Sequence, residues 1–268
     1  MIEPAYIAEV ITEAALAVEE IPPTWYENFA RHFHQNFIHE DRYMLILNGL
    51  WATIQVSFFG ILLGSILGVL VTGMKMGRSS FFGKYLGIHF IDKIINSIFN
   101  AISYLYVDVI RGTPAVTQLF IFWYVIFSPN TNFSRMTVAI IAIGINAGAY
   151  IAEIIRAGIL SVDKGQTEAG RTLGLSSLMT MRYIIAPQAV KNILPTLVNE
   201  FIILIKETAI IGMIGVQDMN RASILIRSRT FNAWMPLIAT AILYYIVIKI
   251  LTVFLRRLEK RIRQSDVR

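Results

Sequence analysis

Ionisable residues lie inside stretches of the sequence that are otherwise strongly apolar. Glu153 lies within the apolar run 136–159, and Lys206 and Glu207 are neighbours within the run 194–216. Burying a charge among apolar surroundings costs at least a few kcal/mol, so such residues are candidates for function by default. A carboxylate accepts hydrogen bonds from a cation, and an ammonium group donates them to an anion. These residues are therefore candidates for lining the path of a charged or polar solute.

A polar segment, 161–188, separates these two apolar runs. Asp163 or Ser161 can cap a short helix, and Gly174 fits the position just past its end. A second helix then begins, which Pro187 is expected to interrupt. The sequence thus predicts a helix, a tight turn and a helix, which serve either as an ordinary polar loop or as a docking element.

The composition is that of an integral membrane protein. Of 268 residues, 55% are hydrophobic and only 16% are charged, and the mean hydropathy is +0.58. A water-soluble domain of this length carries about a quarter charged residues, which argues against a soluble protein with a large core. The net charge of +6 fits basic cytoplasmic loops better than nucleic-acid binding. The absence of cysteine excludes disulfides and thiolate metal sites, and the four histidines show no ligand spacing, so no metal site is expected.

The apolar runs predict an all-α fold with about five transmembrane helices. The expected spans are 45–71, 114–127, 136–159, 194–216 and 235–255. The amphipathic stretch 81–106 carries enough charge to predict an interfacial helix that leads into the second span. Within the first span, glycines at positions 60, 64 and 68 share one face, which predicts close approach of another helix.

The chain is expected to divide into three parts. Residues 1–43 form an N-terminal extracytoplasmic or interfacial segment, residues 44–258 the transmembrane domain, and residues 259–268 a basic cytoplasmic tail. Lysine and arginine placement puts the polar segment 161–188 in the cytoplasm and the N-terminus outside. The basic loop with Arg221, Arg227 and Arg229 disobeys this rule. It is either a docking surface for an acidic external partner or a loop that re-enters the protein.

Several motifs resemble those of permease subunits of ABC importers, in the branch for polar amino acids. Glu168-Ala169-Gly170, followed by Gly174 and then by an isoleucine and Pro187, matches the spacing of the family's "EAA" loop. The chain departs from that pattern in Gly170, which replaces an alanine, and in an alanine at position 186, which replaces a leucine. The stretches RGTPAVTQL, GAYIAEIIRAGILSVDKGQTEAG and NEFIILIKETAI resemble three further segments of that branch, and the likeness covers roughly residues 45–260.

The resemblance implies a type I ABC importer permease that moves a polar amino acid across the bacterial cytoplasmic membrane by alternating access. It implies ATPase subunits as partners, with ATP and Mg²⁺ bound there, and an extracytoplasmic solute-binding protein. It also implies a second permease chain, which is either another copy of this chain or a sister permease. The chain contains no G-x-x-x-x-G-K-[ST] loop, so we expect neither an enzyme nor a cofactor site in this subunit. An ion-coupled secondary transporter is the alternative, although the inverted internal repeats typical of that class are not evident.

The candidate residues fall into three groups. The first group is expected to couple the chain to the ATPase and consists of Gly165, Glu168, Ala169, Gly170, Gly174 and Pro187. The glycines at 170 and 174 are expected to leave a surface without side chains, which a partner can approach closely. An amino acid zwitterion needs both an acceptor and a donor, and the expected substrate path is Gln118, Asn199, Lys206, Glu207 and Thr208. A structural ion pair is the alternative for Lys206 and Glu207. A gate or structural role is expected for Arg111, Glu153 and Arg156, the last two being spaced for pairing on one helix.

Overall fold

The computed structural model describes residues 24–76, 89–127 and 132–263, and these ranges fold almost entirely into helices. The predicted all-α fold is therefore confirmed. The helices are α2 (Trp25–Phe33), α3 (Tyr43–Met76), α5 (His89–Gly112), α6 (Ala115–Phe120), α7 (Arg135–Leu160), α8 (Lys164–Thr172), α9 (Ser177–Thr180), α10 (Ala186–Glu207), α11 (Met219–Thr230) and α12 (Trp234–Arg263). Short π-helical and 3₁₀ segments continue several of them: η1 (His34–Ile38), η2 (His39–Asp41), η3 (Ile121–Ile126), η4 (Met181–Ile185) and η5 (Thr208–Ile214).

Helices α3 and α7 form the most extensive helix pair, and glycines let them approach. A Cβ atom added at Gly64 would lie 2.9 Å from the Ala147 Cβ and 3.1 Å from the backbone of Gly144 and Gly148. One added at Gly68 would meet the Ile151 side chain at 2.6 Å. Small residues on one stripe permit this distance between helices in lipid, where close van der Waals packing drives association. The predicted glycine face of the first span is confirmed.

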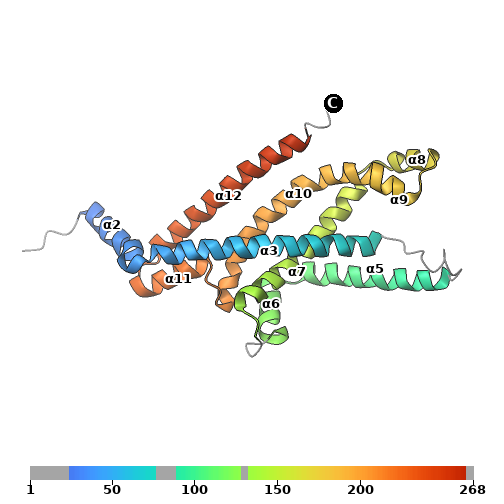
Figure 1. Ribbon diagram of the computed structural model, residues 1–268. Coiled ribbons are helices and arrows are strands. Elements are labelled where there is room, and N and C mark those ends of the chain that lie inside the picture. The colour runs from blue at the N-terminus through green and yellow to red at the C-terminus, as the bar shows by residue number, and fades with distance from the viewer. Residues whose placement is uncertain (1–23, 77–88, 128–131, 264–268) are drawn as a thin grey trace, which may run out of the picture.

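The segment predicted to lie at the interface is instead a helix packed within the bundle. Helix α5 runs beside α3 and also contacts α7 (Figure 1). Asp92 and Ser103 are buried, whereas Ile98 and Leu105 on the other face are exposed. Of the charges that suggested a membrane-surface helix, Asp92 is buried, whereas Lys93 and Asp108 are exposed, and the helix runs along α3 rather than across its end. The interfacial assignment of this stretch was wrong for this reason.

The second predicted span, 114–127, is one arm of a bent pair that it forms with α5. The chain turns by 109° between α5 and α6, and α6 with η3 covers only Ala115–Ile126. Pro114 causes the break, because it lacks an N–H and its extended backbone starts the new helix. The helix entry predicted at this proline is confirmed, but the segment that follows is too short to cross a bilayer alone.

By length and composition, fewer than five of the described helices qualify as spans. Helices α3, α7 and α12 are long and apolar enough, and the bent pair of α5 and α6 makes a fourth if it counts as one span. Helix α10, which carries Lys191, Glu200, Lys206 and Glu207, is not among them. The predicted fourth span therefore corresponds to a helix whose polar side chains require a partner surface or a water-filled path.

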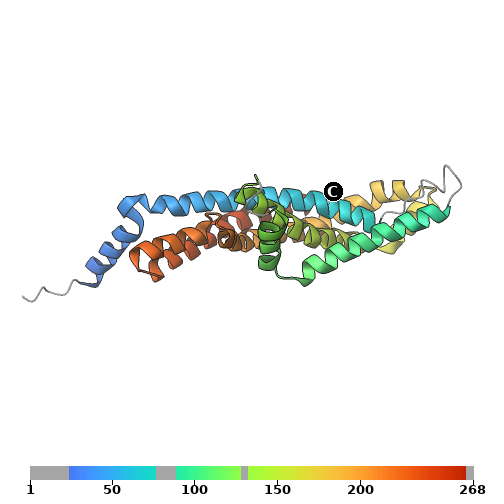
Figure 2. The same cartoon turned by 90° about the horizontal axis from the view of Figure 1, so that it is seen from below.

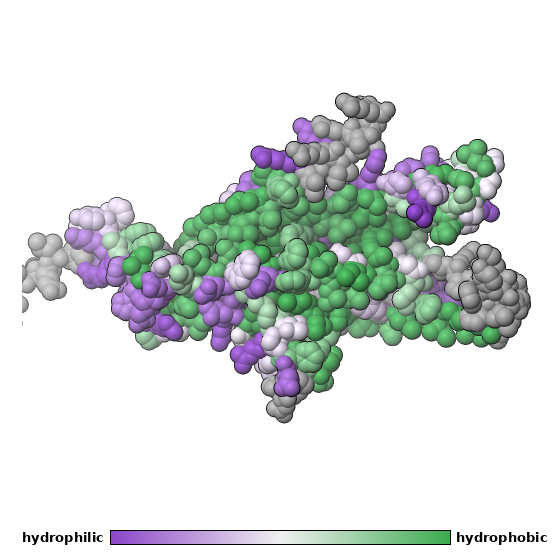
Figure 3. Space-filling model, in the orientation of Figure 1, coloured by the Kyte–Doolittle hydropathy of each residue, from purple (hydrophilic) through white to green (hydrophobic). Residues whose placement is uncertain are grey.

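The two ends of the bundle differ in what they carry. Helices α8 and α9 lie at one end, with the C-terminal end of α3 (Figure 1). Helices α2 and α11 lie at the opposite end of α3, and both views place them there (Figures 1 and 2). The surface is hydrophobic over the middle of the bundle, and hydrophilic residues gather towards the ends (Figure 3). Residues 1–23 of the predicted N-terminal segment lie outside the described residues.

Candidate functional site

The polar segment between α7 and α10 folds as a helix hairpin, as predicted. The Asp163 carboxylate caps α8 by accepting a hydrogen bond of 2.7 Å from the Gly165 N–H, which decides between the two expected caps. Gly174 follows the helix with φ of +80°, a left-handed conformation that favours glycine. Ser176 caps α9 by accepting from the Met179 N–H at 3.3 Å. Local sequence signals therefore specify this hairpin well.

Gly170 does not form part of a bare docking surface. It is buried, and a Cβ atom there would lie 2.8 Å from Thr180 and 3.0 Å from Ile184 of the returning helix. Its small size closes the hairpin instead of admitting a partner, so that part of the prediction was wrong. Glu168 and Ala169 beside it are exposed, and these are the positions from which another chain can be reached.

Pro187 does not interrupt the second helix. It occupies the first turn of α10, where proline is tolerated because that N–H needs no helical partner. The π-helical segment η4 directly precedes it, so the backbone stays helical from Ser177 to Glu207. Pro187 and Gly165 are both exposed on the hairpin side of the molecule. Instead of an interruption at Pro187, the helix has a widened, π-helical turn at Met181–Ile185.

A cavity of about 750 Å³ lies between α7 and α10. It is lined by groups of both charges, among them Arg111, Glu153 and Glu200. Asn192 and Ser161 line its hairpin end, where the Asn192 Nδ2 donates to the Ser161 Oγ at 2.9 Å. Arg111 and Glu153 also line a second cavity of about 360 Å³ between α3, α5 and α7. The two cavities therefore meet at this pair of charges.

Glu153 is the centre of the charge network between the cavities. The Arg156 Nε donates to both Glu153 carboxylate oxygens, at 2.9 and 3.0 Å, and its Nη2 donates to the same group. The Lys75 Nζ of α3 lies 3.7 Å from Glu153 Oε2. The Arg111 guanidinium stacks on the Tyr150 ring, with 5.5 Å between its Cζ and the ring centroid. The predicted pairing of Glu153 with Arg156 is confirmed, and Lys75 adds a third helix to it.

Gln118 was expected to line the substrate path, but it lines neither of the two cavities. Its amide Nε2 donates to the Ile110 carbonyl at 2.7 Å and to the Thr113 Oγ1 at 2.8 Å, and its Oε1 accepts from Asn146 at 2.9 Å. The buried amide satisfies the backbone groups freed at the bend between α5 and α6 and fastens that bend to α7. Gln118 is therefore a structural residue in this arrangement.

The other expected path residues are dispersed around the end of α10. Thr208 is fully buried and its hydroxyl donates to the Ile205 carbonyl at 2.7 Å, so it serves the helix end. Asn199 and Lys206 are exposed, whereas Glu207 is half-buried. None of these residues lines the larger cavity, whose α10 wall is formed by Asn192, Pro195, Thr196 and Glu200. The structure thus does not bring the predicted path together around Gln118.

Three lining residues were missed as members of one site. Lys75, Tyr150 and Glu200 belong to different helices, and their convergence depends on how those helices pack. Glu200 carried a signal, because it is an ionisable residue in an apolar run, one heptad before Glu207. For Lys75 the signal pointed elsewhere, because a lysine at a helix end is usual at a membrane surface.

The three arginines that disobeyed the charge rule all lie on helix α11. Helix α11 packs against α3, α12 and η1, and Asp218 caps its N-terminus. Arg227 and Arg229 are exposed, and Arg221 is half-buried. The segment is thus a helix packed on the bundle, and the two interpretations, a docking surface and a re-entrant loop, both stay predictions. Burial raises the pKa of the Asp218 carboxyl from 3.8 to about 6, against hydrogen bonds from two backbone N–H groups.

Comparison with known proteins gives consistent matches over most of the chain. Residues 86–264 match the family described as "Binding-protein-dependent transport system inner membrane component". The glutamine transport system permease protein GlnP of Escherichia coli K12 is 37% identical over 221 residues, which cover 82% of this chain and 93% of that protein. The putative glutamine transport system permease protein GlnP of Rickettsia typhi is 33% identical over 219 residues, which cover 81% and 93%.

Two solved structures have a similar fold. A crystal structure of an amino acid ABC transporter with histidines superimposes with a TM-score of 0.73 at 37% identity, over 84% of this chain and 98% of that one. An inward-facing structure of the MetNI methionine ABC transporter superimposes with a TM-score of 0.63 at 18% identity, over 82% and 96%. The second likeness concerns the fold alone.

Proposed function

Because the chain belongs to the family of binding-protein-dependent transport system inner membrane components, as the permease subunit of an ABC importer, we propose that its cargo is a polar amino acid. Glutamine is the first candidate, since the relatives from Escherichia coli and Rickettsia are named for glutamine transport. The observation that carries the proposal is the cavity between α7 and α10, which offers a guanidinium and two carboxylates within one space.

The cavity suits a zwitterion with a polar side chain. The Arg111 guanidinium can bind a carboxylate, and Glu200 can accept hydrogen bonds from an ammonium group. Arg156 and Lys75 already neutralise Glu153, so it fits a gate or structural role better than direct binding. Asn192 and Thr196 supply neutral polar groups for an amide side chain. Substrate binding in this cavity therefore replaces the path first expected around Gln118.

The hairpin of α8 and α9 is proposed to couple this subunit to the ATPase. Glu168 and Ala169 are exposed on α8, and Gly170 and Gly174 hold the hairpin closed beneath them. The hairpin connects α7 to α10, the two helices that line the cavity. A rigid hairpin that the ATPase displaces would therefore move both walls of the cavity. Closure of two ATPase subunits would move the hairpins and turn the cavity from one side of the membrane to the other.

The polar face of α10 calls for a further partner inside the membrane. Asn192, Thr196, Asn199 and Lys206 are exposed along that helix. Polar side chains at membrane depth face other protein or a water-filled path, so a second permease chain is proposed to complete the pathway. The hairpin end would face the cytoplasm with the C-terminus, and the α2 end would face outwards. ATP and Mg²⁺ would bind to the partner ATPase, and a solute-binding protein would deliver the cargo from outside.

Uptake by reconstituted proteoliposomes tests this function. The chain is co-expressed with an ATPase subunit and a solute-binding protein, and uptake of labelled amino acids is followed with and without internal ATP. ATP-dependent uptake of glutamine or another polar amino acid is the expected result. Arg111→Lys should weaken uptake, because a lysine cannot present a paired fork to a carboxylate. Uptake that needs an ion gradient and no ATP would overturn the proposal in favour of a secondary transporter.

A further inference from the structure

Helix α2 carries its aromatic side chains on one face. Trp25, Phe29 and Phe33 recur every four residues, and all three are exposed, Trp25 to 82%. The opposite face is polar and includes Arg31. A capping box starts the helix, in which Glu27 accepts a hydrogen bond of 2.8 Å from the Thr24 N–H. An amphipathic helix with an aromatic face of this kind is typical of the boundary between lipid headgroups and acyl chains.

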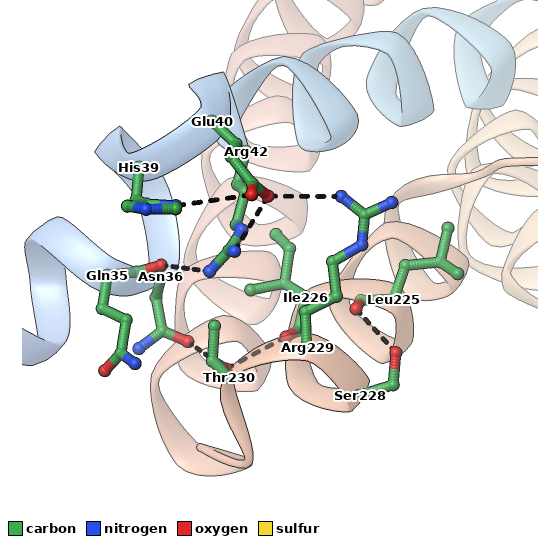
Figure 4. Close-up of polar contacts among 10 residues, drawn as sticks. All are labelled: Gln35, Asn36, His39, Glu40, Arg42, Leu225, Ile226, Ser228, Arg229 and Thr230. Atoms are coloured by element: carbon green, nitrogen blue, oxygen red, sulfur yellow. Dashed lines mark hydrogen bonds and ion pairs between the residues drawn. The ribbon is translucent and has the colours of Figure 1, made fainter.

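The segment after α2 is fastened to the α11–α12 corner by a buried amide (Figure 4). The Asn36 side chain is fully buried, donates to the His32 carbonyl at 2.7 Å and accepts from the Thr230 hydroxyl at 2.8 Å. Because a buried amide without partners would be costly, these bonds define the position of η1 against α11. The N-terminal segment is thus held in place from Asn36 onwards.

The turn from η1 into α3 fixes the direction of α2. Glu40 and Asp41 both have positive φ, at 56° and 51°, which is unfavourable for residues other than glycine. The buried Arg42 side chain holds this turn by donating to the Gln35 carbonyl at 2.6 Å and to Glu40 at 2.9 Å (Figure 4). Glu40 also lies 3.8 Å from the Arg229 guanidinium. Helix α2 therefore turns away from the axis of α3 in a defined way (Figure 1).

An apolar groove of about 290 Å³ lies beside the aromatic face. Its walls come from α2 with η1, from the first turns of α3 and from the start of α12, and they include Phe33, Phe37, Ile46, Leu47 and Leu243. The Phe33 and Phe37 rings are 5.1 Å apart between centroids. The groove is continuous with the exposed apolar surfaces of α3 and α12, two helices long enough to cross the membrane.

We propose that α2 is a membrane-interface anchor whose aromatic face enters the lipid, and that the groove holds an acyl chain of a membrane phospholipid. Two spanning helices begin here, so lipid chains surround their first turns. Trp234 at the start of α12 contacts Phe29, with 6.4 Å between ring centroids, and Trp25 lies one turn before Phe29. Tryptophan and other aromatic rings at span ends mark the headgroup level. The charged turn around Glu40 then lies on the aqueous side.

Spin labels test the anchor, because the chain contains no cysteine. Single labels are placed at Phe29→Cys on the aromatic face and at Arg31→Cys on the polar face of the full chain, assembled with its ATPase in phosphatidylethanolamine and phosphatidylglycerol liposomes. The Phe29→Cys label should be more accessible to oxygen, which concentrates in lipid. The Arg31→Cys label should be more accessible to a water-soluble nickel complex. Equal values at the two sites, or nickel access at both, would overturn the anchor.

A photoreactive benzoylphenylalanine at Phe33 tests the occupant of the groove. This substitution keeps an aromatic ring, and His34, which is exposed on the polar side, takes the matched control substitution. After irradiation, mass spectrometry should find phospholipid adducts at Phe33 and several-fold fewer at His34. Crosslinks to a second copy of this chain, or equal lipid adducts at both positions, would refute acyl-chain binding in the groove.

Discussion

Enlarging Gly64 should destabilise the bundle at its main helix contact. A Cβ atom there would lie 2.9 Å from the Ala147 Cβ, 3.1 Å from the Gly144 oxygen and 3.1 Å from the Gly148 nitrogen. Two of the three atoms belong to the backbone of α7, so a rotamer change cannot relieve the contact. Overpacking of this kind costs about 1–3 kcal/mol, and we expect Gly64→Ala to lie in that range and Gly64→Val above it.

Gly73 is the matched control on the same helix. No atom lies within 4 Å of a Cβ added there, so Gly73→Ala should be neutral or stabilising by up to about 1 kcal/mol through helix propensity. Thermal unfolding in detergent, followed by tryptophan fluorescence, separates the two variants. Gly64→Ala should lower the Tm by roughly 2–12 °C relative to the wild type, whereas Gly73→Ala should not lower it. Equal Tm values for the two variants would refute close helix approach as the role of the glycine stripe.

Three further perturbations address other parts of the structure. Gly170→Val should leave membrane insertion intact but reduce transport and ATPase binding, because the new side chain would collide with Thr180 and open the hairpin. Co-purification of the ATPase with the variant measures this loss. Unchanged co-purification would contradict the role of the hairpin. Because burial raises the pKa of Asp218 from 3.8 to about 6, the folded state binds the proton more tightly. The contribution of Asp218 to stability should therefore be greatest below about pH 4 and decrease by up to roughly 3 kcal/mol as the pH rises through about 6. Asp218→Asn should flatten that profile, and an unchanged slope in denaturation curves across this pH range would argue against it. Glu153→Gln should cost about 2 kcal/mol in stability, because Arg156 loses its charged partner; a variant as stable as the wild type would show that the pair adds nothing.

Local features of the sequence predicted local structure well. The cap at Asp163, the left-handed Gly174 and the glycine stripe of α3 depend on residues within one or two turns of each other, and all were found as expected. A helix was also expected to start at Pro114, and α6 does begin directly after it, although the bend of 109° at this point was not predicted.

Predictions that depended on which way a helix face turns were less successful. The charges of the stretch before residue 106 suggested a membrane-surface helix, but Asp92 is buried against the protein. Gly170 was expected to face a partner and faces Thr180 instead. In both cases the sequence showed which residues share a helix face. It did not show what packs against that face, because the neighbouring element comes from a distant part of the chain.

By itself, the sequence determined the membrane class, the helical fold, the hairpin and the family, because apolar length, capping residues and ordered motifs are properties of contiguous residues. Only the tertiary structure decided the site. It brought Lys75, Arg111, Glu153 and Glu200 from four helices to two joined cavities, and it assigned Gln118 to the bend between α5 and α6. The physical reason is that charge pairing and cavity shape depend on the packing of helices distant in the chain. The hydrophobic periodicity of the sequence shows which face of each helix is apolar but not which helix packs against it.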